Sequence, residues 1–388
     1  MEEVIYTIIS LAFLVLILFV IPSRIVKLRI SRIIKALILF TYLYILLSVF
    51  INSCYFLAPK KNVIKKENYV SVKALFATNR KTTNEPTLKF TNERDSLKYG
   101  ITYISIPNDH KIGEIESPVW WKFEFKEDPE KHITVLSKKI VTKDQFFNYE
   151  SSNYSQKLLL FVHGYNVSFE EAAKRTGQMT YDMNFEGIPI FFSWPSKGLT
   201  ATYTHDAENI EYSIKHITQF LNQTLSNYPK HEIFIIAHSM GTRGLTKSLI
   251  NIYSENEEYK KRITHVFLAA PDIDAQIFKE NIAPKIISEN GKFTLYSSSK
   301  DKALIASKEV NGFPRAGDSG KGLVVMEGIE TVDASNINTG FLSHSYFGDS
   351  RSVISDIDQI IDHRLPADDR FGLEAVILEN QKYWKFRK

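Results

Sequence analysis

Short, uninterrupted apolar runs alternate with amphipathic segments through the second half of this 388-residue chain. Apolar runs of about four to eight residues are typical of strands that are buried on both faces of a parallel sheet. The segments between them repeat apolar residues with a helical period, so helices would cover both faces. The pattern predicts an α/β fold with a mostly parallel sheet, built from runs such as KLLLFV (157–162), IPIFF (188–192), EIFIIA (232–237) and HVFLAA (265–270).

Two of the intervening segments carry clear helix signals. Ser168 precedes the first, and Glu171 follows three residues later, which is a capping box for a helix over 168–183. The second, over residues 207–228, places Ile210, Ile214 and Ile217 on one face. Further helices are expected from residues 241 and 275 onward and over 352–363, and further strands over 292–301 and 322–333.

Residues 69–154 differ in pattern from residues 155–365. They hold three β-rich pieces, SVKALFATN (71–79), YGITYISIP (99–107) and HITVLSKKI (132–140), between polar and proline-containing stretches. We expect residues 69–154 to form a β-rich portion packed on an α/β core at 155–365. Residues 366–388 would then be a C-terminal tail.

The N-terminal 66 residues have the character of a membrane anchor. Residues 4–21 and 36–58 are uncharged and apolar all round, and at about 1.5 Å per residue each is long enough to cross a hydrocarbon layer of about 30 Å. We therefore expect a transmembrane hairpin. An alternative is a lipoprotein-type signal ending at Cys54, with the sequence INSC before the cleavage point. Basic residues flank the second run on both sides, so the charge count does not determine sidedness.

Charge and cysteine content exclude several classes of function. The net charge is +4, but residues 1–66 alone carry +7, so the remainder is weakly acidic and has no basic footprint for nucleic acid. A single cysteine excludes an intramolecular disulfide and a cysteine-based metal cluster. The histidines show no metal-ligand spacing, so neither a metal nor a cofactor is expected.

The sequence IIAHSMGTR (235–243) places Ser239 directly after a predicted buried strand and before a predicted helix. A serine on such a turn is the arrangement called a nucleophile elbow, in which the residues two before and two after must be small. Ala237 and Gly241 meet that requirement. Ser239 is therefore the candidate nucleophile.

A serine hydroxyl needs a base to take its proton and an acid to orient that base. In this architecture the chain order is serine, carboxylate, histidine. Asp301, just past the strand segment KFTLYSSS (292–299), and His344, in the loop GFLSHSYFGD, satisfy that order. Asp272 ends the preceding strand and is an alternative acid. His163 and His238 are interpreted as structural.

Two backbone N–H groups are candidates for the oxyanion hole that acyl transfer requires. One belongs to Met240, directly after the nucleophile, and the other to Tyr165, in the sequence HGYN after the first strand of the core. Gly164 would let that backbone approach closely.

With these residues assembled, the chain resembles the α/β-hydrolase superfamily and, more narrowly, the bacterial DUF900 group of esterase/lipase-like hydrolases of unknown function. The resemblance covers residues 74–360 through LFATNR, FVHGYNVSFEEAAKRTGQ, FFSWPSKG, IIAHSMGTRGL, FLAAPDIDAQIF and LSHSYF. It implies an α/β-hydrolase fold with Ser239 as nucleophile and, with the apolar runs, a place in the bacterial inner membrane. Arg80 and Arg94 match arginines of the group's pattern and are structural or pocket-lining candidates.

The residues therefore predict a membrane-anchored serine esterase that cleaves a small-molecule or lipid ester without a cofactor. One alternative is a membrane-bound interaction module that keeps the fold without the chemistry, because fold alone does not establish function. Another is an acyltransferase, in which an acceptor other than water takes the acyl group.

Overall fold

The computed structural model describes residues 34, 37–41, 68–83, 88–119, 124–148, 156–197, 203–287, 292–337 and 346–387. The chain divides into two compact units, Met1–Lys66 and Glu67–Lys388. In the first unit only residues 34 and 37–41 are described, and they are helical. Most of the predicted hairpin and Cys54 lie outside the described residues. Within the described ranges, no helix combines the length and apolarity needed to cross a membrane.

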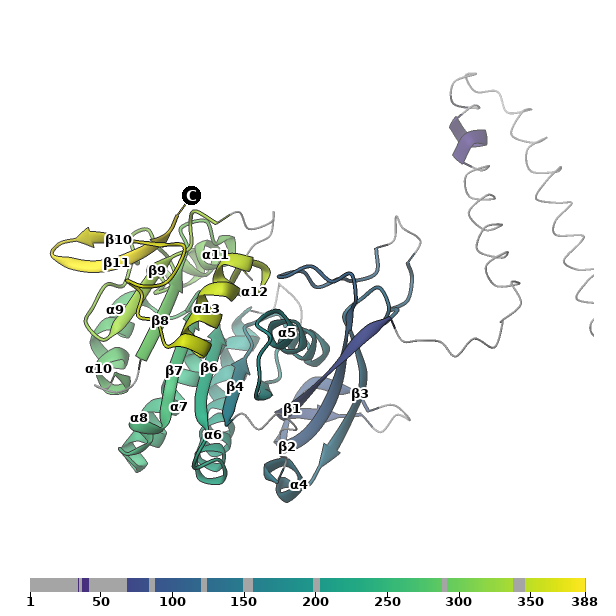
Figure 1. The fold of residues 1–388 in the computed structure, drawn as a ribbon, viewed down its shortest axis with the longest axis horizontal. Helices are drawn as coiled ribbons and strands as arrows, with labels where there is room; N and C mark the ends of the chain where they lie inside the picture. Colours follow the sequence, from purple (N-terminus) through teal and green to yellow (C-terminus); the bar gives the residue numbers. More distant parts are fainter. Residues whose placement is uncertain are drawn as a thin grey trace, which may run out of the picture. The chain divides into compact units, whose positions relative to one another are not determined.

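The second unit is built on an 11-stranded sheet in the described part of the chain (Figure 1). The strands lie in the order β10-β11-β9-β8-β7-β6-β4-β5-β1-β2-β3. All neighbours from β11 to β1 are parallel, and the pairs β10/β11, β1/β2 and β2/β3 are antiparallel. The predicted mostly parallel sheet is confirmed. The strands are β1 (Tyr69–Thr82), β2 (Phe90–Pro107), β3 (Thr134–Val141), β4 (Lys157–Val162), β5 (Ile188–Ser193), β6 (Glu232–His238), β7 (Ile263–Ala269), β8 (Lys292–Ser297), β9 (Ile329–Asp333), β10 (Leu373–Leu378) and β11 (Gln381–Phe386).

The helices cover both faces of this sheet. Their bounds are α4 (Lys143–Phe147), α5 (Phe169–Asp182), α6 (Tyr203–Asn227), α7 (Gly241–Glu255), α8 (Tyr259–Arg262), α9 (Ala275–Ile277), the π-helical turn η4 (Phe278–Ile282), α10 (Ala283–Ile286), α11 (Lys302–Asn311), α12 (Tyr346–Asp349) and α13 (Arg351–His363). The capping box predicted at the start of α5 is present, with the Ser168 side chain accepting from the Glu171 N–H.

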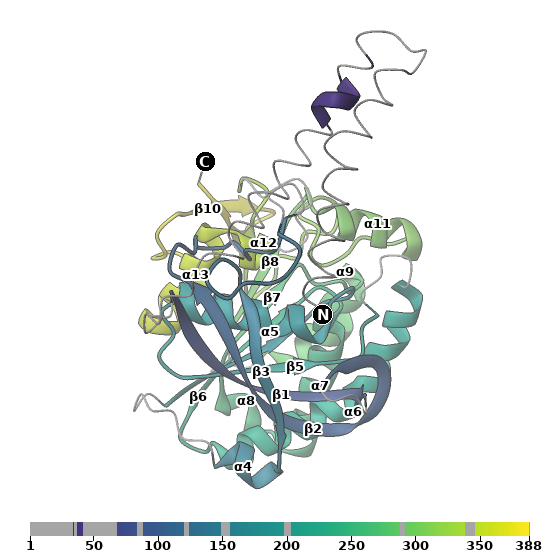
Figure 2. The ribbon, with the colours of Figure 1, turned by 90° about the vertical axis from the view of Figure 1, so that its right-hand side faces the viewer.

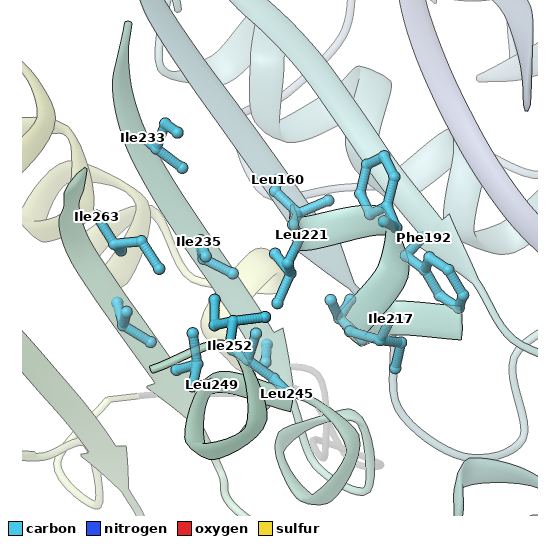
Figure 3. Packing of buried hydrophobic residues seen from close by; sticks show 14 of the residues in the cluster. Leu160, Phe192, Ile217, Leu221, Ile233, Ile235, Leu245, Leu249, Ile252 and Ile263 are labelled. Carbon is cyan, nitrogen blue, oxygen red and sulfur yellow. The ribbon is translucent and has the colours of Figure 1, made fainter. Parts of the chain in front are cut away.

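Each central strand contributes alternate side chains to two separate hydrophobic cores. In β4, Leu158 and Leu160 belong to the core under α6 and α7, whereas Leu159 and Phe161 belong to the core under α5 and α13. Figure 3 shows the first of these cores, where residues of α6 and α7 pack on residues of β4, β5, β6 and β7. Burial on both faces explains why the strands read as continuous apolar runs.

Both edges of the sheet are formed by segments outside the predicted core. β1 extends the sheet by pairing in parallel with β5, from Leu75 opposite Ile190 to Thr78 opposite Ser193. Figure 2 views this edge, with β1, β2 and β3 nearest the viewer. At the other edge, residues 366–388, which the sequence pattern predicts to be a tail, hold the hairpin of β10 and β11. Its two-residue turn, Glu379 and Asn380, has φ values of 47° and 64°, as a hairpin turn of the I′ type requires.

Two elements differ from the sequence expectation. The strand expected over 322–333 is reduced to β9, because the chain turns at Gly328, where φ is 84°. Helix α4 was not predicted, although Thr142 and Gln145 form a capping box at its start. That signal was present in the sequence TKDQ.

A buried imidazole fixes the turn after β2 to α5. Nδ1 of His110 lies 2.9 Å from both carboxylate oxygens of Glu116, and Nε2 lies 2.8 Å from Oδ1 of Asp182. Burial by itself would lower the pKa of His110, but the two carboxylates outweigh it and raise the pKa to about 9. At neutral pH the ring is therefore an imidazolium that holds the turn on the helix.

We predict that the contribution of His110 to stability disappears in alkaline solution. Its folded-state pKa lies above the ordinary value of about 6.5, so the contribution is complete below that pH and is lost as the pH rises through about 9. Urea unfolding at several pH values should show a gap in unfolding free energy between wild type and His110→Gln that shrinks with rising pH. The exposed His363 supplies the control variant, His363→Gln. A gap that stays constant would contradict the prediction.

Candidate active site

Four loops that carry candidate residues meet at the carboxyl ends of neighbouring strands β8, β7, β6 and β4. Asp301 follows β8, Asp272 follows β7, Ser239 follows β6 directly, and Tyr165 follows β4. Ligands of parallel sheets bind at this end of the strands. The structure therefore brings four of the five predicted loops to one edge. His344, in the fifth, lies outside the described residues.

Ser239 occupies a strained turn between β6 and α7. Its φ is 51°, in the left-handed region that non-glycine residues rarely adopt. Such a conformation costs about 1–3 kcal/mol and persists only where the surroundings enforce it. The Ser239 N–H donates to the Ala269 carbonyl at 2.9 Å, and its own carbonyl accepts from the Thr242 hydroxyl at 2.6 Å. The residue is buried, so the turn is held from both sides.

Close backbone packing explains the glycines on either side of this turn. A Cβ at Gly241 would lie 2.9 Å from the Val162 carbonyl oxygen and closer still to that of His163. A Cβ at Gly164 would lie 2.9 Å from the Cβ of Ser239. The sequence HGYN (163–166) therefore passes directly against the serine, and α7 begins against the end of β4.

The start of α7 lies directly after the Ser239 turn. Met240 is its N-cap, is fully buried, and no side chain caps the helix. The first N–H groups of a helix and its dipole stabilise negative charge at this end. Met240 therefore lies where an oxyanion-hole donor is expected.

The HGYN loop, which carries Tyr165, is fixed by a buried carboxylate. Oδ2 of Asp206, in α6, accepts the Asn166 N–H at 3.2 Å and the Ser196 hydroxyl at 2.5 Å. Asn166 itself has a φ of 58°. Ser196 in turn accepts the Val167 N–H at 3.1 Å. These bonds preorganise the backbone next to Ser239.

Arg80 is a buried support of the same loop and does not line the cavity beside it. Its guanidinium donates to the Val167 carbonyl at 2.7 Å, the Ser193 hydroxyl at 2.8 Å and the Ser196 carbonyl at 3.0 Å. Burial lowers its pKa to about 10, so it stays charged at neutral pH. Arg94 lies over the ring of Tyr212 at 4.7 Å. Both arginines have structural contacts.

Asp301 is the N-cap of α11 and is buried, with 1% of its surface exposed. Its Oδ1 accepts the N–H groups of Ala303 and Leu304, each at 3.0 Å. Two backbone donors fix the orientation of the side chain. Such a fixed carboxylate is suited to orienting an imidazole.

Asp272 is engaged in a different way. Its Oδ2 accepts from the Tyr203 hydroxyl at 2.8 Å and from Arg243 at 2.9 Å, and its Oδ1 lies 3.1 Å from Nε of Arg315. Burial opposes ionisation, but the two guanidinium groups outweigh it and lower the pKa of Asp272. Both carboxylate oxygens are therefore occupied by neighbours on other elements.

The two remaining histidines of the region differ in their surroundings. His163 is stacked on Trp194 with ring centroids 5.1 Å apart, and burial together with the nearby Arg80 lowers its pKa to about 3. His163 is thus neutral and braces the loop, as predicted. His238, which the sequence analysis interprets as structural, is among the residues that line the adjacent cavity.

A cavity of about 760 Å³ lies against the HGYN loop, α5 and the first turn of α11. Apolar side chains, among them Ile115, Phe161 and Ala306, form part of its wall, and Lys174 and Lys302 contribute charge. Volumes of this size accommodate small organic ligands. No group of histidine, cysteine and carboxylate side chains in the described ranges is arranged to hold a metal ion.

Sequence reasoning missed three residues that organise this site, namely Tyr203, Asp206 and Arg243. Arg243 stands in the motif itself, two residues after Gly241. The available signal was that Arg243 is a charged residue on the first turn of α7, a helix that is otherwise apolar toward the sheet. The other two are brought to the site by α6, whose placement the local pattern does not reveal.

Residues 139–364 match the family DUF900, alpha/beta hydrolases of unknown function. Similar solved structures include a predicted CIB-like hydrolase from Thermoplasma acidophilum (14% identity, 59% of this chain and 91% of that chain, TM-score 0.32). Another is an alpha-beta serine hydrolase homologue from Coxiella burnetii (12% identity, 69% and 93%, TM-score 0.31). A third is a cold-adapted esterase from an Arctic intertidal metagenomic library (12% identity, 74% and 93%, TM-score 0.34). No curated protein matches the sequence.

The parallel sheet with helices on both faces and the turn at Ser239 define the protein as an alpha/beta hydrolase. Because the family match covers more than half of the chain, the protein belongs to the DUF900 family.

We predict that Gly241→Ala destabilises the protein by about 1–3 kcal/mol or more, because the added Cβ meets backbone atoms of β4 that have no room to move. Gly320→Ala is the matched control, since its Cβ would meet only the side chain of Asp318. Urea unfolding measures both. Equal unfolding free energies for the two variants would contradict this close packing of α7 on β4.

Proposed function

We propose that the protein is a membrane-anchored serine hydrolase that cleaves an acyl ester through a covalent acyl-enzyme. The observation that carries the proposal is the strained turn at Ser239, with φ of 51°, between a buried strand and an uncapped helix start. Strain of this kind concentrates at active sites. The HGYN loop packed against the serine supports the same function.

In the proposed mechanism Ser239 Oγ attacks the acyl carbonyl carbon while His344 takes the hydroxyl proton. The N–H groups of Met240 and Tyr165 would stabilise the oxyanion, and loss of one such donor typically costs about 10²–10³ in rate. The C–O bond to the alcohol then breaks, and the imidazolium protonates the leaving oxygen. Water, deprotonated by His344, attacks the acyl-enzyme and releases the carboxylic acid and the free serine.

We assign the acid role to Asp301 in preference to Asp272. Asp301 Oδ1 accepts two backbone N–H groups of its own helix, which sets the orientation of the carboxylate. To orient an imidazole, Asp272 would have to give up its ion pairs with Arg243 and Arg315. Removing the partner of a buried charge is strongly destabilising, typically by about 3–5 kcal/mol.

The substrate we propose is a small-molecule or lipid ester whose acyl group enters the cavity beside the HGYN loop. Its volume of about 760 Å³ and the apolar part of its wall suit an acyl chain. The apolar runs 4–21 and 36–58 would hold the enzyme at a membrane, where lipid esters are at hand.

A fluorophosphonate probe tests the nucleophile, since serine Oγ displaces fluoride from its phosphorus only when activated. We expect stoichiometric labelling of the wild type and none of Ser239→Ala. Ser248→Ala, which replaces a buried serine on α7, the helix that follows the Ser239 turn, should label like the wild type. A wild type that does not react would count against a catalytic role.

The acid assignment predicts that Asp301→Asn lowers kcat by about 10³–10⁴, because an amide favours the wrong imidazole tautomer. Asp274 is a matched control: it caps α9 with the same pair of bonds, from Gln276 and Ile277 at 2.9 Å. Asparagine is also a good N-cap, so Asp274→Asn should leave kcat unchanged. Similar kcat values for both variants would show that Asp301 is only a helix cap.

A further inference from the structure

Four side chains contact the carboxylate of Asp272, and a fifth, from Asn311, bonds two of those four. We call them, with Asp272, the Asp272 cluster. Oδ2 accepts from Tyr203 and Arg243, and Oδ1 accepts from the Ser307 hydroxyl at 2.5 Å and lies 3.1 Å from Nε of Arg315. Asn311 donates to both Tyr203 and Ser307, at 3.1 and 3.2 Å.

Backbone groups of Asp272 bond the cluster to the Ser239 turn and to the start of α7. The Asp272 N–H donates to the carbonyl of Ser239 at 3.3 Å, and the Asp272 carbonyl accepts from Nε of Arg243 at 2.5 Å. Arg243 lies four residues after Ser239, in the first turn of α7. Asp272, in the loop that follows β7, is thus bonded both to the strained turn and to the first turn of α7.

The cluster also reaches the other two parts of the proposed machinery. Ser307 belongs to α11, the helix whose N-cap is Asp301. The ring of Tyr203 packs edge-to-face on the ring of Tyr165, with centroids 5.7 Å apart. One carboxylate therefore links the elements that carry the nucleophile, the acid and an oxyanion donor.

Tyr203 is the member best suited to couple these elements. Its hydroxyl donates to Asp272 at 2.8 Å and accepts from Nη2 of Arg243 at 2.5 Å. Arg243 and Asp272 also pair directly, so removing the hydroxyl keeps the charges balanced. A change at Tyr203 would loosen the cluster without leaving an ion unpaired.

We infer that the Asp272 cluster is a positioning device for the Ser239 turn and that Tyr203 and Asp272 act as positioning residues rather than as members of the triad. This inference rests on the proposed function. The strained backbone of Ser239 needs surroundings that enforce it, and the cluster supplies bonds on the side of the turn that faces β7. Weakening the Asp272 cluster shifts the Ser239 hydroxyl away from its line of attack on the acyl carbonyl. Proton transfer from that hydroxyl to His344 is unchanged.

The test is the second-order rate constant for fluorophosphonate labelling of the full chain, measured per folded molecule over a range of pH. Tyr203→Phe should be labelled about 10- to 100-fold more slowly than the wild type, because small misplacements of a reacting group have effects of that size. The apparent pKa of the labelling profile should stay at the wild-type value. Ser307→Ala, which removes another donor to Asp272, should act in the same direction.

Tyr212→Phe is the matched control. It also removes a tyrosine hydroxyl from α6, but the contacts of Tyr212 with Arg94 and His216 are made by its ring, which the substitution keeps. It should be labelled at the wild-type rate. Labelling of Tyr203→Phe at the wild-type rate would overturn the inference, since a merely structural bond would lower stability alone. A shifted pKa of the profile would also overturn it, because Asp272 would then act on the base. A wild type that does not react removes the proposed function, and the inference falls with it.

Discussion

The contact between the start of α7 and the end of β4 is the constraint on which the rest of the site depends. A helix that returns over the sheet directly after β6 must begin against the backbone of the neighbouring strand, and there Gly241 leaves no room for a side chain. The chain can make that reversal only by taking Ser239 into the left-handed region. The same reversal presents the serine at the carboxyl edge of the sheet, beside a helix start whose dipole favours negative charge.

Buried charges hold the loops around this turn, and they come from distant parts of the chain. Arg80 belongs to β1, yet it bonds Val167, Ser193 and Ser196 near the carboxyl ends of β4 and β5. Asp206 accepts loop N–H groups, and Asp272 accepts from Tyr203 of α6 while its own N–H donates to the carbonyl of Ser239. Burying charged groups is costly unless each is fully bonded. Residues 69–82 are therefore part of the support of the site and not only an addition to the edge of the sheet.

Much of the fold could be predicted from local patterns, and the reason is physical. Strands buried on both faces must be continuously apolar, and a capping box such as Ser168 with Glu171 marks a helix start wherever it occurs. The pairing of β1 with β5 and that of β11 with β9 could not be placed so readily, because strand pairing between distant segments leaves no local signal.

The sequence could predict which loops form the site, but not which side chains bond to one another within it. Asp272 and Asp301 both follow apolar strands, so the sequence leaves both open as the acid, and the distinction lies in Arg243, Arg315 and the N–H groups of α11. The position of His344 stays a prediction, as does the membrane anchor. The most direct test of the central claim is mass spectrometry of peptides from enzyme quenched with acid during hydrolysis of a short p-nitrophenyl ester. The account predicts an acyl group on the peptide that contains Ser239, and hydrolysis with the acyl group on another residue would contradict it.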